Sequence, residues 1–192
     1  MISLALVLQI FALLNPLSSF SVLMSAYKKK LDVHAIAIKS SLFAYAIAIF
    51  IIFAGPQFFS FYGVNVDSFR IAGGLVLLLL GIETVRPKPV REDVNEADST
   101  VAIIATPLLT GPAVISFLTI SAMEMPVMDL VVNSTAAFSI VGIVFVLFSY
   151  AIPKVDVKIV ELLSKVMGLF LTALAIQMIT KGISAIYAIP IY

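Results

Sequence analysis

Long stretches without any charged residue constrain the fold of this 192-residue chain more than any other feature. Four of them contain no Asp, Glu, Lys or Arg: Met1–Tyr27, Ser40–Val66, Ser99–Met123 and Leu130–Pro153. Each exceeds the roughly 20 apolar residues that a helix needs to cross a bilayer. Hydrophobic residues make up 61% of the chain and charged residues 12%, against about 45–50% and 25% in soluble domains. The sequence therefore predicts an integral membrane protein.

Two shorter charge-free runs, residues 71–82 and 166–180, complete the predicted set of spans. Single charges flank each run and can reach the lipid headgroups from helices near Asp67–Val85 and Lys158–Tyr187. We therefore predict an all-α protein with six transmembrane helices. The first three-helix repeat would occupy residues 1–85, a cytoplasmic linker residues 86–99, and the second repeat residues 100–192.

The distribution of basic residues predicts how the chain is oriented. Ten of the twelve Lys and Arg residues flank the first, third and fifth loops, which the positive-inside rule assigns to the cytoplasm. Both termini are then expected on the extracytoplasmic side of a multi-pass protein of the cell membrane. The formal net charge of +1 excludes a strongly basic nucleic-acid-binding protein.

Landmark residues recur at nearly the same spacing in the two halves. Pro16 and Pro112 are 96 residues apart, each near the middle of the opening span of its half. Pro56 and Pro153 are 97 residues apart, and each is expected to end a middle span. Because each half has an odd number of spans, the repeats must be inverted in the membrane. This pattern is typical of secondary transporters, whose binding site lies between the repeats at mid-bilayer.

Prolines within the first and fourth spans predict two discontinuous helices. Proline has no N–H for the carbonyl four residues earlier, so Pro16 is expected to free the carbonyl of Ala12, and Pro112 that of Leu108. Exposed helix ends attract carboxylates at their N–H groups and cations at their carbonyls. Since no ionised side chain lies at that depth, the site suits a small zwitterion. The predicted substrate-binding residues are Asn15, Pro16, Ser18, Ser19, Thr106, Pro107, Thr110, Gly111, Pro112 and Ser116.

The alternative interpretation of these prolines is a pair of kinks that only shape the bundle, which membrane helices commonly tolerate. Their equivalent positions in the two predicted repeats favour the binding site.

Four motifs resemble those of the MarC family of integral membrane proteins, over nearly the whole chain. The motifs are residues 14–17 (Leu-Asn-Pro-Leu), 69–74 (Phe-Arg-Ile-Ala-Gly-Gly), 107–116 (from Pro107 to Ser116), and 167–169 with 175–179. For SnatA-like members the resemblance implies transport of small neutral amino acids such as glycine and alanine, coupled to an ion gradient. It places the family's Asn-Pro motif at Asn15-Pro16 and its Gly-Pro motif at Gly111-Pro112. Ser18-Ser19 stand where the family often has a glycine, so pocket size does not follow from the resemblance.

Two basic residues in the third and sixth spans have nearby acidic partners. Asp67 lies three residues before Arg70, and Glu161 lies four before Lys165. Both are ion-pair spacings on a helix, so local pairs are expected in preference to gating or to binding a substrate carboxylate.

Glu83 is the candidate coupling residue, because an intramembrane carboxylate is often functional. Arg86 follows three residues later, so an interfacial ion pair is an equal alternative. Four further positions are predicted to pack helices together or to line the cavity: Gly73, Gly74, Gly168 and Gln177.

The sequence therefore predicts a secondary transporter of small neutral amino acids that works by alternating access and couples to Na⁺ or H⁺. Its expected partners are a small zwitterionic substrate and the lipid bilayer, and a homo-oligomer is left open. No cofactor, metal site or enzyme activity is predicted, since cysteine and the common enzyme motifs are absent. The alternatives are a passive channel, an exporter of other small solutes, and a membrane scaffold that transports nothing.

Overall fold

Seven helices form the part of the chain that the computed structural model describes, which is residues 2–28, 30–86, 111–152 and 157–187. In chain order they are α1 (Leu4–Leu14), α2 (Pro16–Lys28), α3 (Val33–Tyr62), α4 (Val66–Val85), α6 (Pro112–Glu124), α7 (Val127–Ala151) and α8 (Val157–Tyr187). No strand occurs within these ranges. Apart from Arg86, the predicted linker at residues 86–99 lies outside the described residues.

Four of these helices are long and apolar enough to cross a membrane: α3, α4, α7 and, from Ile159 onward, α8. Large apolar side chains on their outer surfaces are more than half exposed, among them Phe50, Leu79 and Ile143. Contiguous apolar surface of this extent is stable against lipid and not against water. The predicted all-α integral membrane protein is therefore confirmed. Helices α1, α2 and α6, with 11, 13 and 13 residues, are each too short to span a bilayer alone.

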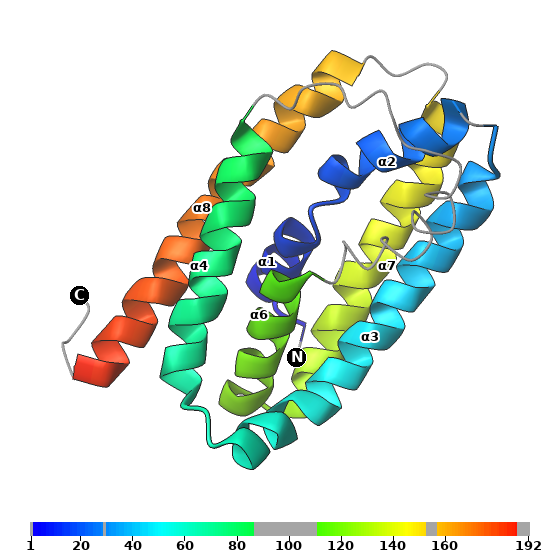
Figure 1. Cartoon of the computed structure of the whole chain (residues 1–192). Helices are drawn as coiled ribbons and strands as arrows, with labels where there is room; N and C mark the ends of the chain where they lie inside the picture. Colours follow the sequence, from blue (N-terminus) through cyan, green and yellow to red (C-terminus); the bar gives the residue numbers. More distant parts are fainter. Residues whose placement is uncertain (1, 29, 87–110, 153–156, 188–192) are drawn as a thin grey trace.

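Two antiparallel pairs of long helices form the bundle, α4 with α8 and α3 with α7 (Figure 1). Within the second pair, Tyr45 Oη lies 2.9 Å from Thr135 Oγ1, and His34 Nδ1 lies 3.1 Å from Ser149 Oγ. The short helices α1 and α6 lie between the two pairs and contact each other. The interior of the bundle is thus built around short helices that end or begin inside it.

Glycines allow an unusually close contact between α4 and α8. A Cβ atom on Gly81 would lie 2.9 Å from the backbone nitrogen of Thr172 and 3.0 Å from the carbonyl oxygen of Gly168. A Cβ atom on Gly182 would lie 2.8 Å from the carbonyl oxygen of Asp67. Small residues let helix backbones approach in lipid, where packing drives association. The two backbones therefore touch along most of α4.

Helix α3 begins earlier than the charge-free run that predicted it. The side chain of Asp32 accepts a hydrogen bond of 3.0 Å from the N–H of Ala35, which caps the helix at Val33. Its first turns, which include Lys39, are therefore helical although the hydropathy pattern placed the span from Ser40 onward.

Pro56 does not end α3, contrary to the prediction. The helix continues to Tyr62 and ends at Gly63, whose φ of 60° lies in the left-handed region that favours glycine. A proline removes only one backbone hydrogen bond, and membrane helices tolerate this loss where neighbouring helices pack around it. Gly55, next to Pro56, packs directly against Thr119 of α6.

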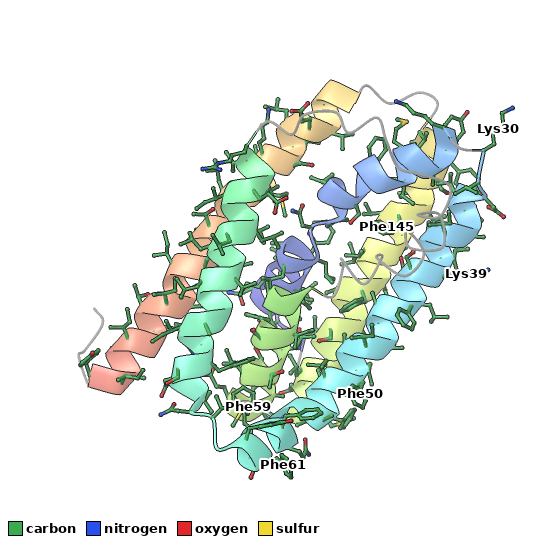
Figure 2. The ribbon with its side chains drawn as sticks, viewed as in Figure 1. Lys30, Lys39, Phe50, Phe59, Phe61 and Phe145 are labelled. Atoms are coloured by element: carbon green, nitrogen blue, oxygen red, sulfur yellow. The ribbon has the colours of Figure 1, made fainter. Side chains whose placement is uncertain are left out.

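Two lysines and two phenylalanines in and beside α3 lie toward opposite ends of the bundle. Figure 2 shows Lys30 and Lys39 toward the end where α2 meets α3, and Phe59 and Phe61 at the far end of α3. The two ends therefore differ in the chemistry that they offer to a membrane surface.

Candidate functional site

Helix α1 ends and α2 begins on either side of Asn15, where the sequence predicts an interruption. Asn15 has φ 42° and ψ 60°, in the left-handed region that Asn adopts more readily than most residues. Pro16 is the first residue of α2, a position at which a backbone N–H is not needed. In Figure 1 this break lies inside the bundle, between the two pairs of long helices. The predicted discontinuity of the first helix is therefore present.

One detail of the prediction was wrong: the carbonyl of Ala12 is not free. The N–H of Asn15 donates to the carbonyl oxygens of both Phe11, at 3.2 Å, and Ala12, at 3.1 Å. The left-handed turn at Asn15 tightens the end of α1, so that one donor serves two carbonyls, as is common at helix termini. Pro16 therefore leaves less unbonded backbone than the sequence suggested.

The unpartnered polar group at this break is instead the Asn15 side chain. Asn15 is 5% exposed, and its Oδ1 atom has no hydrogen-bond partner within the described part of the chain. An asparagine that precedes a helix usually accepts a hydrogen bond from the second or third N–H of that helix. Asn15 does not, so the first turn of α2 also lacks this cap. Leaving such a group buried and unsatisfied costs about 1–3 kcal/mol.

A second helix, α6, begins close to this break. It starts at Pro112, and its N-cap residue Gly111 offers no side chain to cap the first turn. Helix α1 contacts α6, and in Figure 1 the start of α6 lies beside α1. Of the other predicted binding residues, Ser19 is half-buried in α2. Outside the described residues lie Thr106, Pro107 and Thr110, together with the side chains of Ser18 and Pro112.

Ser116 lies one turn into α6 and faces α4. It is 5% exposed, and a Cβ atom on Gly73 would lie 2.8 Å from its Oγ atom and 3.4 Å from Cε of Met178. The neighbouring Gly74 faces α8, where a Cβ atom would lie 2.7 Å from Cγ1 of Ile179. The two glycines thus bring α4, α6 and α8 together around Ser116.

A small chamber lined by both polar and apolar side chains lies beyond Ser116, toward the C-terminal end of α6. Its volume is about 70 Å³. We call it the polar chamber and define it by the polar side chains of four helices that line it: Gln9 of α1, Arg70 of α4, Ser121 and Glu124 of α6, and Gln177 and Lys181 of α8.

Arg70 is the most buried charged residue of the polar chamber, with a side chain 11% exposed. Its Nη1 atom donates to Oδ1 of Asp67 at 2.7 Å, as the helical spacing predicted. Its Nη2 atom pairs with Oε1 of Glu124 on α6, which the sequence did not predict. The other predicted pair is also present, with Lys165 Nζ 3.1 Å from Glu161 Oε1. Arg70 therefore joins α4 to α6 as well as stabilising its own helix.

Comparison with known proteins assigns the chain to a family. The family model for MarC family integral membrane proteins matches residues 2–187. The chain belongs to the MarC family. A UPF0056 membrane protein of Methanocaldococcus jannaschii is 31% identical over 189 residues, which cover 91% of this chain and 92% of the relative. Similar proteins of Pyrococcus horikoshii (31% over 195 residues; 93% and 92% covered) and Aquifex aeolicus (24% over 196; 92% and 89%) carry the same name. No solved structure matches the chain.

The remaining candidates of this MarC-family protein occupy three different places. Gln177 is exposed on α8 and lines the polar chamber with Arg70. Gly168 is buried at the contact of α8 with α4. Glu83 is exposed near the C-terminal end of α4, about 20 Å along that helix from Arg70. The structure therefore groups Gln177 with charged residues and leaves Glu83 apart.

Four residues of the polar chamber were not among the sequence candidates: Gln9, Ser121, Glu124 and Lys181. A signal for Lys181 was available, because Arg70 and Lys181 are the two basic residues of twelve that lie outside the predicted cytoplasmic loops. Gln9 and Glu124 had no such signal, since only the packing of α1 and α6 against α4 and α8 brings them to Arg70.

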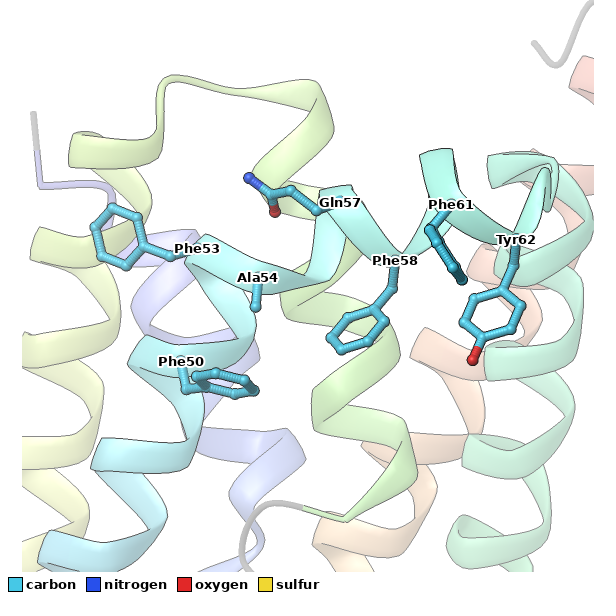
Figure 3. A pocket seen from close by; sticks show the side chains of 7 residues that line it. All are labelled: Phe50, Phe53, Ala54, Gln57, Phe58, Phe61 and Tyr62. Carbon is cyan, nitrogen blue, oxygen red and sulfur yellow. The ribbon is translucent and has the colours of Figure 1, made fainter.

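A hollow on the surface of this MarC-family protein faces lipid and is not the candidate site. It has a volume of about 650 Å³ and lies on the outer face of α3 (Figure 3). Gln57 and Tyr62 supply its polar side-chain groups. The rest of the lining is apolar: Phe50, Phe53, Ala54, Phe58 and Phe61. Such a surface fits lipid chains better than a small polar solute.

Proposed function

We propose that this protein is a secondary transporter of small neutral amino acids, such as glycine or alanine, that works by alternating access. The proposal is carried by the Oδ1 atom of Asn15, which is buried between two helix ends and has no partner among the described residues. Proteins pair nearly all their buried polar side-chain atoms with each other or with a ligand. A hydrogen-bond donor from a substrate would satisfy this oxygen.

The chemistry of the break favours a solute that carries both charges. The N-termini of α2 and α6 present backbone N–H groups and the positive ends of helix dipoles, which attract a carboxylate. The amide oxygen of Asn15 accepts hydrogen bonds and suits an ammonium group. A side chain with an additional charge would be desolvated there without a partner, which is costly. Small neutral amino acids match these requirements.

Packing between the halves of the chain supports two inverted repeats. Helices α4 and α8 hold equivalent places in the predicted halves and pack on each other, as do α3 and α7. Helix α6 of the second half packs on α3 and α4 of the first, while α2 packs on α7 and α8. This exchange of the broken helices is expected of inverted repeats, which place the substrate between them. With two discontinuous spans, the four long helices would give six in all.

The basic end of the bundle supports an orientation in the cell membrane. Lys30 and Lys39 lie at one end, which the positive-inside rule places in the cytoplasm (Figure 2). The termini would then lie outside. Na⁺ or H⁺ would supply the driving force, with Glu83 as the candidate carboxylate near the cytoplasmic end of α4.

Counterflow in proteoliposomes tests the proposal directly. Vesicles loaded with unlabelled glycine are expected to take up labelled glycine faster than empty vesicles, because a carrier exchanges substrate across its two states. Imposed sodium and proton gradients, applied separately, identify the coupling ion. Pro16→Ala allows α1 and α2 to merge and is expected to stop counterflow, whereas the matched control Pro56→Ala, in the continuous helix α3, is expected to retain it.

Each alternative predicts a different result. A passive channel shows uptake without acceleration by internal glycine, and an exporter of other solutes exchanges those solutes but not glycine. A membrane scaffold shows neither uptake nor glycine-dependent thermal stabilisation, which a ligand bound only to the folded state must produce. Absence of both glycine and alanine counterflow would refute the proposal.

A further inference from the structure

We propose that the polar chamber is a second binding site for the same zwitterion, in which Arg70 and Lys181 hold its carboxylate and Glu124 holds its ammonium group. This second site rests on the proposed function, because the chamber lies beside the break and would hold the substrate on its way to Asn15. The buried, unpartnered oxygen of Asn15 is not part of it.

The charges of the polar chamber are unusual for this chain. Arg70 and Lys181 are the two basic residues that lie away from the other ten, and both line this one chamber. Two carboxylates accompany them, Glu124 in the lining and Asp67 behind Arg70. The four charges sum to zero. A solute of zero net charge can exchange partners with these groups, whereas a net charge would leave one charge unpaired in a partly buried place.

Both basic residues retain hydrogen-bonding capacity. The guanidinium group of Arg70 carries five N–H donors, and its ion pairs with Asp67 and Glu124 each engage one terminal nitrogen. Donors are therefore left for a third carboxylate. Lys181 forms no ion pair within the ranges that the structure describes, and its ammonium group carries three more donors. A substrate carboxylate between Arg70 and Lys181 would use these donors.

The ammonium group of the substrate has an acceptor in the same chamber. Glu124 is 55% exposed in its side chain and lies at the last residue of α6, so it can move between Arg70 and a bound cation. Binding would then replace the Arg70–Glu124 pair, which joins α4 to α6, by two pairs with the substrate. Substrate binding would thus change the contact of α6 with α4 through Glu124.

Size and position agree with this role. A volume of about 70 Å³ holds roughly five water-sized groups, the number of non-hydrogen atoms in glycine. Gln9 precedes Asn15 by six residues, which places the chamber about 9 Å along α1 from the break. Met178 lines the chamber and also approaches Gly73 beside Ser116. Its flexible side chain would be the one to move when substrate passes.

The experiment compares charge-removing variants of the chamber with matched variants outside it. Lys181→Gln and Glu124→Gln change exposed side chains, and Arg70 keeps its pair with Asp67 in both variants, so we expect the fold to be kept. Lys165→Gln and Glu161→Gln are the controls, because they remove the same charges from the exposed pair at the other end of α8. Glycine counterflow is measured over a range of concentrations with the full chain in proteoliposomes. Glycinamide, which lacks the carboxylate, and glycolate, which lacks the ammonium group, are added as competitors.

Each chamber variant is expected to raise KM for glycine about fivefold with an unchanged maximal rate, because the substitution removes one charged contact from the initial binding of glycine and no contact from the later steps. Lys181→Gln should also shift competition toward glycinamide, and Glu124→Gln toward glycolate. Lys181→Arg keeps the charge and should restore KM, while the two controls should match the wild type.

A KM within twofold of wild type in both chamber variants, with active transport, would overturn the second site and leave the proposed function standing. Absence of both glycine and alanine counterflow in the wild type would refute the proposed function. Equilibrium dialysis of labelled glycine then tests the second site. Binding to the wild type that is lost in Lys181→Gln supports the site. No binding to the wild type, or equal binding to both proteins, overturns it.

Discussion

Asn15→Gly separates the two roles that Asn15 could have, as a left-handed backbone position and as a ligand-binding side chain. Glycine adopts φ 42° without steric cost, so the break between α1 and α2 would be kept. Removing the buried, unpartnered Oδ1 atom recovers about 1–3 kcal/mol. Two effects lower the stability of this variant: glycine adds chain entropy to the unfolded state, worth about 1 kcal/mol, and the missing side chain leaves a small void. The net expectation is a protein about 1 kcal/mol more stable to unfolding.

The same variant is expected to lose transport. A hydrogen bond to a charged group contributes about 1.5–3 kcal/mol, so loss of the Asn15 oxygen should weaken glycine binding by about 10- to 100-fold. A purely structural asparagine predicts the opposite: stability falls or stays the same while transport is kept.

Two measurements check this prediction on one preparation. The chain contains no Trp, so unfolding in detergent is followed by circular dichroism at 222 nm, where about 1 kcal/mol corresponds to roughly 2–4 °C in Tm. Glycine counterflow measures KM. Asn15→Ala is the control, because it also removes the oxygen but keeps a Cβ atom. A Cβ atom at positive φ costs about 1–2 kcal/mol of folding stability. An Asn15→Gly protein of lower Tm with wild-type KM would refute the functional interpretation of the side chain.

Four further substitutions test the helix packing, one hydrogen bond and one ion pair by thermal unfolding. Gly81→Ala should lower stability by about 1 kcal/mol because its Cβ atom would meet the backbone of α8. Gly142→Ala is the control: its Cβ atom would lie 3.7 Å from Ser41, so the higher helix propensity of alanine should raise stability by about 0.5–1 kcal/mol. Equal shifts in the two variants would contradict the close contact of α4 with α8. The backbone N–H of Ser3 donates a hydrogen bond of 2.7 Å to Oδ1 of Asn133 on α7. Asn133→Ala removes this acceptor and should lower stability by about 1–3 kcal/mol. Lys165→Ala breaks a half-exposed pair and should change stability by less than about 0.5 kcal/mol.

The features that the sequence predicted well are those set by covalent structure or by helical spacing. Pro16 ends the hydrogen-bond ladder of α1 wherever the rest of the chain lies, so the break was visible in the sequence. Asp67 and Arg70 are neighbours on any helix, and their pair is present. Two of the long charge-free runs, at residues 40–66 and 130–153, and both shorter runs likewise predicted helices that the structure confirms as long enough to span a membrane.

Features that depend on packing between distant helices could not be predicted. Glu124 lies 54 residues from Arg70, and their pair exists because Gly73 lets α4 approach α6. Pro56 was expected to end α3, but the helix continues to Tyr62. The loss of one backbone hydrogen bond at a proline does not end a membrane helix when neighbouring helices pack around it. The predicted roles of Thr106, Pro107 and Thr110 remain predictions, since they lie outside the described residues.

The glycine contacts also indicate which parts of the bundle would move during alternating access. Between α4 and α8, a Cβ atom on Gly81 would meet backbone atoms, and backbone atoms cannot rearrange without separating the helices. Between α3 and α6, a Cβ atom on Gly55 would meet only the side chain of Thr119, which can change rotamer. Helices α4 and α8 should therefore move as one body although they belong to different halves of the chain, and sliding should occur at the contact of α3 with α6.

Paired cysteines test this division, in a chain that contains no cysteine of its own. Gly55→Cys with Thr119→Cys links α3 to α6, and Thr84→Cys with Gly168→Cys links α4 to α8. In both pairs the Cβ atoms would lie 3.1 Å apart, a few tenths of an ångström below the roughly 3.5–4.5 Å found in disulfides. Oxidation of the first pair should stop glycine counterflow, and reduction should restore it. Oxidation of the second should leave counterflow unchanged, because the bond constrains two helices that already move together. Equal loss in both would show that α4 and α8 separate during transport.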